Sequence, residues 1–391
     1  MTAHPRYRRL VALAAGALVA PLALVATTTA PADAAPQKHK HEVYIYKVEK
    51  NLKLAGVGTD TMGDTTTPFL QCNGGDIVLD GMWMVKSVDP YHAPNPDPDE
   101  DPDFPSTNTN GGKYNDLRDV YVLASWPDAD PRRWNFEFEN RAYGDAQVKI
   151  YATCVRGFTE KSGAPNHNHQ ILVRPLTTRT TDFTHWTGHP TLGPNRSYYS
   201  WGAGASTVDP TGCGAGEYFV APGFKMTASM PQKYHRLVAS YPAVNPGAPG
   251  RGWTWEFGES VPLSVSPTNL PNINLYGKCI SRKVGANPHT HALAMKHMPS
   301  ADVSTGTGVN IPVGDPRFVE YSCDQDEPDF FGYKAAVGFF WVGHNWHHNW
   351  FLGMEPRPKT RVFGFWNAGA VSVETRFGAL CINSRTANPI L

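Results

Sequence analysis

The feature that most constrains the fold of this chain is a pattern, built on six cysteines, that occurs three times. In each copy one cysteine precedes a glycine-centred apolar stretch and a second cysteine ends a later one, in the segments VKIYATC, INLYGKC and TRFGALC. A pattern that repeats at the length of a whole domain indicates three tandem domains rather than a short-period solenoid. The opening cysteines are Cys72, Cys213 and Cys323, and the closing cysteines are Cys154, Cys279 and Cys381.

Alternation of period two predicts the secondary structure within each copy. The segments WNFEFEN and WTWEFGE, and more weakly VFGFWN, place large apolar residues at every second position, between turns rich in Gly, Pro and Asn. Such segments are half-buried strands. A glycine follows each opening cysteine by nine or ten residues, at Gly81, Gly223 and Gly332. We therefore predict an all-β chain of three antiparallel β-sandwich or jelly-roll-like repeats.

A pair of histidines separated by one residue opens each copy. The pairs lie in QKHKHEV, PNHNHQI and NPHTHAL, and after the third closing cysteine the chain ends where a fourth pair would begin. The predicted domains are therefore residues 35–160, 161–284 and 285–391. The paired histidines are His39 with His41, His167 with His169, and His289 with His291.

If the chain is exported, as its first residues indicate below, its six cysteines favour disulfides over metal thiolates. Six cysteines allow 15 connectivities. Because similar domains are expected to carry the same bridge, the repeat selects one disulfide in each domain. The predicted pairs are Cys72–Cys154, Cys213–Cys279 and Cys323–Cys381. Each would close a loop of roughly 60–80 residues and contribute about 4 kcal/mol in the chain-entropy model.

The first 34 residues have the features of a secretory leader. Arg6, Arg8 and Arg9 form a positive region, Leu10 to Ala26 is apolar, and small residues lead to a cleavage site after Ala34. We expect a secreted, extracellular protein that can associate with the cell surface. No later apolar run reaches the roughly 18–20 residues needed to span a bilayer, so no transmembrane segment is expected.

The composition excludes some partners and favours others. Lys plus Arg and Asp plus Glu number 35 each, which argues against nucleic acid and against an anionic membrane surface. Aromatic residues make up 12% of the chain, enough for a large aromatic core or binding face. The expected partners are a polymer, a surface protein or a second copy of the chain.

The arrangement of a cysteine, a glycine-centred strand, the segments SWP or SYP followed by an aromatic strand, and a closing Y-x-x-C resembles Cys-bracketed β-repeat domains of secreted actinobacterial surface proteins. The resemblance covers the second half of each repeat. It implies an exported surface module and carries no catalytic residues.

The histidine pairs are the best candidates for a metal site. On a strand, residues i and i+2 face the same side, so each pair presents two imidazoles together. If the three repeats met about a threefold axis, six imidazoles could bind iron, nickel, cobalt or zinc octahedrally, as the H-x-H pairs of trimeric phage needle tips do. The alternative is that the pairs persist only because the repeats were duplicated. A metal held by neutral imidazoles would be lost as the pH falls through about 6.

Enzymatic uses of H-x-H fit less well. The segments after His169 and His291 lack the glutamate that cupins place there. The alternative from another class is a copper oxidoreductase resembling jelly-roll monooxygenases, since the third repeat has PHTH, nearby methionines and HNWHHNW. No hydrolase motif with supporting context is present.

Two further segments are weaker candidates. The residues Trp346, His347, His348 and Trp350 could form a ligand surface or belong to an aromatic core strand. Asp97, Asp99, Asp101 and Asp103 have the alternating spacing of a calcium loop but lack its glycine and glutamate, so a solvated insertion is the alternative. The sequence thus predicts a non-catalytic binding or structural protein of three β-domains.

Overall fold

The computed structural model describes most of the chain from residue 40 onward. The described residues are 40–56, 65–88, 117–140, 142, 144–161, 168–182, 187–189, 193–201, 212–227, 235–243, 250–259, 272–286, 289–298, 307–314, 316–323, 332–343, 349–387 and 389–390. The expected leader, residues 1–34, lies outside them.

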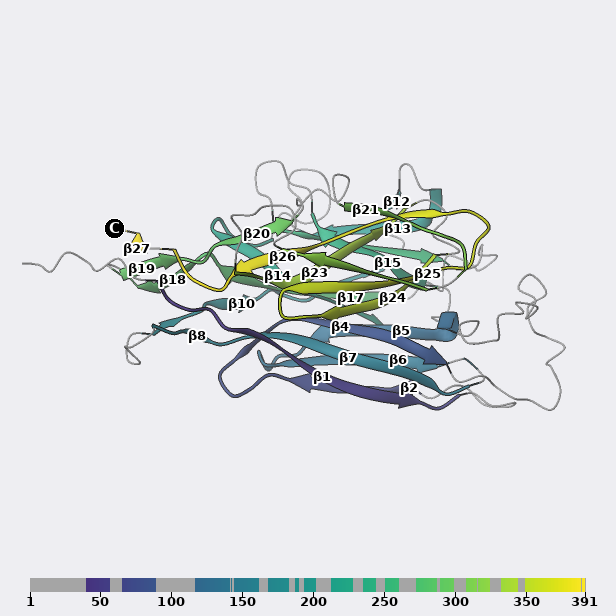
Figure 1. Cartoon of the computed structure of the whole chain (residues 1–391), viewed down its shortest axis with the longest axis horizontal. Coiled ribbons are helices and arrows are strands. Elements are labelled where there is room, and N and C mark those ends of the chain that lie inside the picture. The colour runs from purple at the N-terminus through teal and green to yellow at the C-terminus, as the bar shows by residue number, and fades with distance from the viewer. Residues whose placement is uncertain are drawn as a thin grey trace, which may run out of the picture. The chain divides into compact units, whose positions relative to one another are not determined.

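Antiparallel strands make up nearly all of the regular structure (Figure 1). Within the described ranges the only helical element is a single 3-10 turn, η1 (Leu117–Asp119). The prediction of an all-β, antiparallel chain is therefore confirmed. In the same ranges, no helix is long and apolar enough to cross a membrane.

Three large sheets hold most of the strands. The first sheet has the order β1 (Ile45–Leu54), β7 (Ala146–Val155), β4 (Ile77–Val88), β24 (Asn349–Pro356), β25 (Thr360–Asn367) and β22 (Arg317–Ser322). The second has the order β10 (Val173–Pro175), β17 (Asn272–Ser281), β14 (Glu217–Thr227), β5 (Val120–Pro127), β6 (Arg133–Asn140) and β2 (Thr65–Thr66), with β11 (Arg179–Asp182) on β17 and β3 (Phe69–Gln71) on β6. The third has the order β12 (Thr187–His189), β13 (Gly193–Trp201), β16 (Trp253–Glu259), β15 (His235–Pro242), β23 (Tyr333–Val342), β26 (Val373–Asn383) and β20 (Met295–Met298), with β21 (Thr307–Ile311) on β26.

Two small sheets complete the described structure. One contains β18 (Lys283–Ala286), β19 (His289–Ala292) and β27 (Pro389–Ile390), and the other contains β8 (Phe158–Thr159) and β9 (His169–Gln170).

Each large sheet combines strands from two of the three predicted repeats. The junctions are the pairs β4 with β24, β14 with β5, and β15 with β23. They connect the first repeat with the third, the second with the first, and the third with the second. Each predicted repeat therefore shares one sheet with each of the other two, so the folding unit includes all three.

The three disulfides pair as predicted, one within each predicted repeat. The closing cysteines lie on the long strands β7, β17 and β26. No cysteine is free. Each bridge ties a loop segment to the strand that pairs with the start of β4, β14 or β23.

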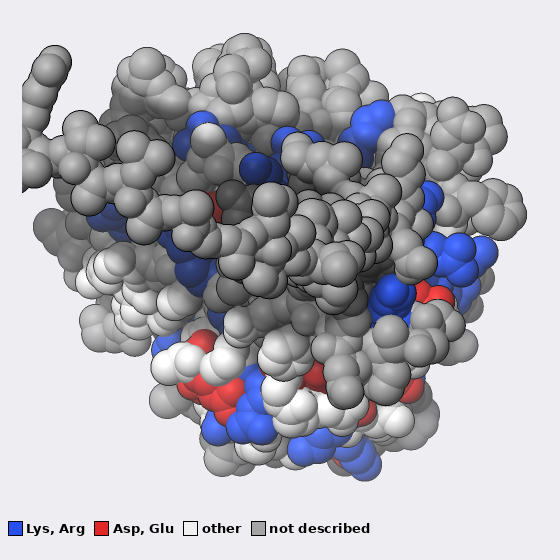
Figure 2. Space-filling view, turned by 90° about the vertical axis from the view of Figure 1, so that its left-hand side faces the viewer, with Lys and Arg blue, Asp and Glu red and all other residues white. Residues whose placement is uncertain are grey.

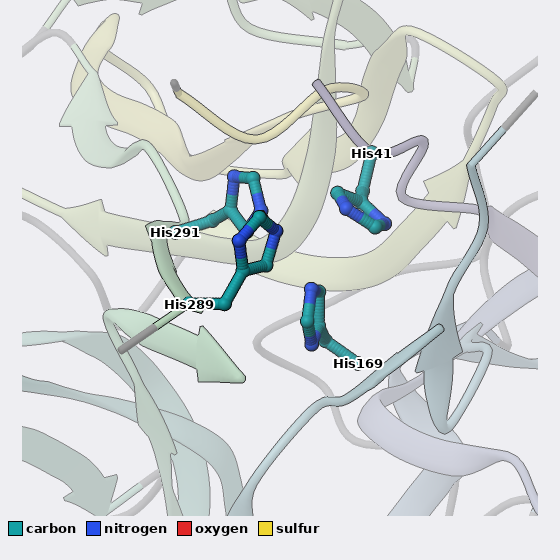
Figure 3. Close-up of side chains that lie close together, drawn as sticks. All are labelled: His41, His169, His289 and His291. Atoms are coloured by element: carbon teal, nitrogen blue, oxygen red, sulfur yellow. The ribbon is translucent and has the colours of Figure 1, made fainter. Parts of the chain in front are cut away.

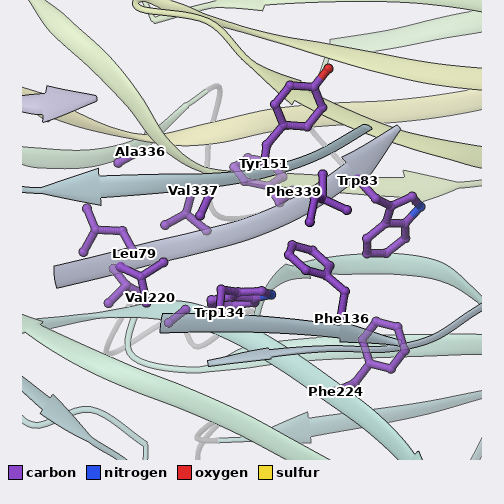
Figure 4. Close-up of a cluster of buried hydrophobic side chains, with 14 of the residues drawn as sticks. Leu79, Trp83, Trp134, Phe136, Tyr151, Val220, Phe224, Ala336, Val337 and Phe339 are labelled. Atoms are coloured by element: carbon purple, nitrogen blue, oxygen red, sulfur yellow. The ribbon is translucent and has the colours of Figure 1, made fainter. Parts of the chain in front are cut away.

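One apolar core draws side chains from all three large sheets (Figure 4). Trp83 comes from the first sheet, Trp134 and Phe224 from the second and Phe339 from the third, all at most 3% exposed. The strands β4, β14 and β23 are buried at nearly every position, so both faces of each strand pack against apolar side chains. A second cluster, which includes Phe340 and Phe365, lies between the first and third sheets.

Two of the three sheet junctions use the same buried pair of side chains. Trp134 donates from its Nε1 to the Oγ of Ser125 over 2.9 Å, and Trp253 donates likewise to Ser240 over 2.8 Å. Each tryptophan stands opposite the proline that ends the neighbouring strand. The indole N–H is thereby satisfied in the core, as a buried tryptophan requires.

The third junction, between β4 and β24, has a buried ion pair instead of the tryptophan and serine. Arg361 occupies the position opposite Pro356, and its Nη1 lies 3.2 Å from the Oδ2 of Asp80, with both side chains fully buried. Its Nη2 also donates to the Thr153 Oγ1 over 2.8 Å. Burial raises the pKa of Asp80 to about 6, although the guanidinium beside it acts in the opposite direction. This pair joins strands of the first and third repeats.

The equivalence of Gly332 with Gly81, suggested by its spacing from the cysteine, is wrong. Gly81 and Gly338 each pair with the residue two positions before the closing cysteine, so Gly338 is the true counterpart. Gly332 has a φ of +92° at the turn before β23, where the first two repeats have Gly75 and Gly216 with φ of +81°. A positive φ favours glycine at these turns.

Two buried histidines outside the predicted metal pairs give the stability a definite pH dependence. Desolvation lowers the pKa of His297 to about 3 and that of His235 to about 4. Both are neutral in the folded protein, whereas the unfolded chain binds a proton on each near pH 6.5. Their contribution to stability is therefore fully present above about pH 6.5 and is lost as the pH falls.

We expect the substitution His297→Leu to flatten the acid side of the stability curve. Each such histidine lowers the free energy of unfolding by about 1.4 kcal/mol per pH unit below 6.5. Urea denaturation of the wild type and the variant between pH 7 and pH 4 measures how the free energy of unfolding changes with pH. The two slopes should differ by about 1.4 kcal/mol per pH unit, the value for one bound proton. Parallel curves would contradict the assignment of a neutral, buried His297.

Candidate metal centre

Four of the six predicted histidines meet at one place, which we call the histidine cluster: His41, His169, His289 and His291 (Figure 3). Together they represent all three predicted repeats. His41 lies just before the isolated bridge at Glu42, His169 lies on β9, and the other two lie on β19.

Three of these rings form a triangle. The ring centroids of His41 and His169 are 4.5 Å apart, those of His41 and His291 are 4.5 Å apart, and the third side is 5.2 Å. These are the second histidines of the three pairs. His41 and His291 are fully buried. One nitrogen from each of the four rings can be chosen so that all lie within 4.8 Å of one another.

Threonine side chains fix the backbone of two of these histidines. The amide of His41 donates to the Oγ1 of Thr386 over 2.9 Å, and the amide of Thr386 donates back to the His41 carbonyl over 2.8 Å. The amide of His169 donates to the Oγ1 of Thr159 over 3.2 Å. Both threonines are at most 1% exposed. The start of the first repeat is thus joined to the segment of the third repeat between β26 and β27.

The tautomer of His291 is set by a backbone carbonyl. Its Nδ1 lies 3.0 Å from the carbonyl oxygen of Ala387, and since a carbonyl only accepts, Nδ1 carries the proton. The lone pair is then on Nε2, which points at the Nε2 of His289 from 3.0 Å. A ring N–H held by a carbonyl is the usual arrangement around a metal-bound histidine.

Gly285 allows the His169 ring to approach the strand β18. A Cβ at this position would lie 2.9 Å from the Nδ1 of His169 and 2.4 Å from the carbonyl oxygen of His289. The φ of Gly285 is +91°, which an ordinary side chain rarely adopts. A residue other than glycine here would displace the ring from the cluster.

The spacing of the two Nε2 atoms on β19 fits a transition-metal ion. Two nitrogens each about 2.1 Å from a metal are about 3.0 Å apart at right angles and about 3.4 Å apart at the tetrahedral angle. The 3.0 Å between the two Nε2 atoms on β19 matches the right angle of an octahedral site. The same distance also suits one hydrogen bond between the rings. An all-imidazole donor set is suited to zinc, copper, iron or nickel.

Most of the other predicted site residues are not described by the structure. His39 and His167, the first histidines of their pairs, lie outside the described residues, as do Trp346, His347 and His348. The acidic loop with Asp97, Asp99, Asp101 and Asp103 also lies outside them. Trp350 lies on β24, is half-buried, and packs against Trp366 with ring centroids 5.3 Å apart.

The sequence analysis missed the residues that orient the histidines. Gly285 lies in the linker VGANP, and Thr386 and Ala387 lie in the matching linker RTANP, but their role depends on contacts between distant parts of the chain. The recurrence of this linker, as SGAPN, VGANP and RTANP, was the available signal.

Comparison with known proteins does not place the chain in a family. No family model matches it, and no curated protein shows significant sequence similarity to it.

Proposed function

We propose that this protein is a secreted, non-catalytic binding and structural protein of the cell surface, whose three β-repeats are locked together by one metal ion at the histidine cluster. The observation that carries the proposal is the convergence of histidines from all three predicted repeats. A catalytic role needs an open coordination position for substrate. Burial of His41 and His291 favours a closed, structural site instead.

The proposed ligand set is octahedral and contains all six paired histidines. The first histidine of the third pair lies beside the triangle, 3.0 Å from its partner. His39 and His167 stand in the same sequence relation to His41 and His169. Six imidazoles about one ion favour iron, nickel, cobalt or zinc, and four would favour zinc.

The test is the metal content of the purified protein. We expect one ion per chain by mass spectrometry of metals, lost in the variant His169→Ala and retained in the matched variant His297→Leu, whose histidine lies outside the cluster. The double variant His39→Ala with His167→Ala separates the ligand sets, because six ligands require both residues and four require neither. Absence of stoichiometric metal from the protein, including after incubation with each of the four ions, would overturn the proposal.

The alternative of a copper oxidoreductase at the third repeat gives a different result. Copper would then bind chiefly through His289 and His291 and survive the removal of His41 and His169. The protein would also show a copper-dependent oxidation of a reductant such as ascorbate.

A further inference from the structure

A groove opens beside the histidine cluster, between the first and third predicted repeats. Its volume is about 580 Å³, within the range of about 300–1,000 Å³ typical of ligand pockets. Its walls are the segment 42–47, the start of β23, the turn between β24 and β25, and residues 384–385. Glu42 follows His41 directly and Arg385 precedes Thr386, so the groove and the cluster share these two segments.

Two cations in the groove have no carboxylate partner. Lys334 and Arg385 form no ion pair with any described carboxylate, whereas the other two cations of the groove are paired, Lys47 with Glu49 and Arg357 with Glu320. Figure 2 looks onto the end of the molecule at which β18, β19 and β27 lie in Figure 1. Lysine and arginine side chains extend across the described surface there, and most carboxylates lie in the lower half.

An exposed aromatic ring lies in the same groove. The side chain of Tyr44 is 55% exposed, and the Arg156 guanidinium covers one face of its ring from 4.7 Å. Tyr46 lies beside it with ring centroids 6.0 Å apart, and its hydroxyl donates to the Oδ2 of Asp76 over 2.6 Å. Tyr44 is thus packed against Arg156 on one face, and its exposed ring lines the groove.

The groove also contains one carboxylate that forms no ion pair with a described residue, that of Glu42. Glu42 and Arg385 pair through their backbones in an isolated bridge, yet their side chains form no ion pair. Glu160, the other carboxylate of the groove, is bound to Arg156. Glu42 can accept hydrogen bonds from hydroxyl groups, which an acidic saccharide has and an acidic peptide largely lacks.

The second repeat has an arginine where the first has Tyr46. Arg174 stands opposite Cys279 as Tyr46 stands opposite Cys154. Its guanidinium is bound by Glu217 through two hydrogen bonds of 2.9 and 2.6 Å. Opposite its closing cysteine the third repeat has Lys296, so a tyrosine at this position is found in the first repeat alone.

We infer that this groove binds an acidic saccharide, with Lys334 and Arg385 on its carboxylates, Tyr44 against a sugar ring and Glu42 on its hydroxyls. This inference deepens the proposed binding function and rests on it. The experiment uses the full-length secreted protein with its metal content measured in each sample, so that failure of the groove and failure of the metal site are read separately.

The probes are an oligogalacturonate, its methyl ester as an uncharged control, and oligoglutamate as an acidic peptide of the same charge. Isothermal titration calorimetry should show binding of the oligogalacturonate alone, weakened by added salt. The double variant Lys334→Gln with Arg385→Gln should raise its Kd tenfold or more, because each charge-assisted hydrogen bond contributes strongly. Tyr44→Ala should raise the Kd severalfold.

The matched control is Lys50→Gln, an exposed lysine of β1 outside the groove, which should leave the Kd unchanged. Equal binding by the double variant and the control would overturn the inference, and so would equal binding of the methyl ester. Binding of oligoglutamate as tight as that of the saccharide would assign the groove to acidic peptides instead. No binding of any probe to metal-loaded wild type would also overturn it, while the metal result would stand.

Discussion

Replacing Arg361 by methionine should lower the free energy of unfolding by about 3–5 kcal/mol, because it leaves the carboxylate of Asp80 buried without its cation. The loss is large since both side chains are fully buried and Arg361 also bonds Thr153 and the carbonyl of Ala336. Urea denaturation at pH 7 followed by circular dichroism measures it. Arg174→Met, which removes an arginine from an exposed pair, is the control and should cost less than about 1 kcal/mol.

A second variant tests whether the loss of stability comes from the unpaired charge of Asp80. The other two junctions place a tryptophan and a serine where this one has Arg361 and Met354. The triple variant Asp80→Val, Met354→Ser and Arg361→Trp should therefore regain most of the lost stability, because apolar replacements of a buried ion pair are often neutral or stabilising. A triple variant as unstable as the single one would show that the pair is needed for more than charge balance.

Removing the metal should destabilise the protein by about 4 kcal/mol when the ion is present at about a thousand times its Kd. The reason is that the folded chain alone assembles histidines from distant segments into one site. Thermal unfolding in EDTA, and after the metal is restored, measures the difference. The amide protons of Thr386 and Ala387 should exchange faster without metal, because their hydrogen bonds hold segments that carry ligands.

Two variants make this result specific. His291→Ala should behave like the EDTA-treated wild type and gain nothing from added metal. His297→Leu leaves the cluster intact and should retain the full response to EDTA. Identical unfolding of the wild type with and without metal would contradict the structural role of the ion.

The local features of the fold could be predicted from the sequence because they depend on neighbouring residues. The alternation in WTWEFGE predicts strand β16, and the repeated spacing of the cysteines selects the three disulfides that are observed. Repetition in the sequence raised the question of whether the three histidine pairs meet, and it did not answer it. In the structure, the four described histidines lie together.

The pairing between repeats could not be predicted, because alternation shows which face of a strand is buried and not which strand lies beside it. The short contacts of β4 with β24, or of β14 with β5, have no signature in either segment. Arg361 was missed for a related reason. It replaces a tryptophan in the weakest copy of the aromatic segment, and only the structure places Asp80 against it.

The shared sheets have a consequence for the origin and the engineering of this chain. A single repeat cut from it would present two unpaired half-sheets, each with a strand edge that fits another copy of the same unit. Three separate copies could satisfy one another around a common axis, as subunits of a ring do. In the single chain, the linkers between the three predicted repeats fix how many of them share these sheets.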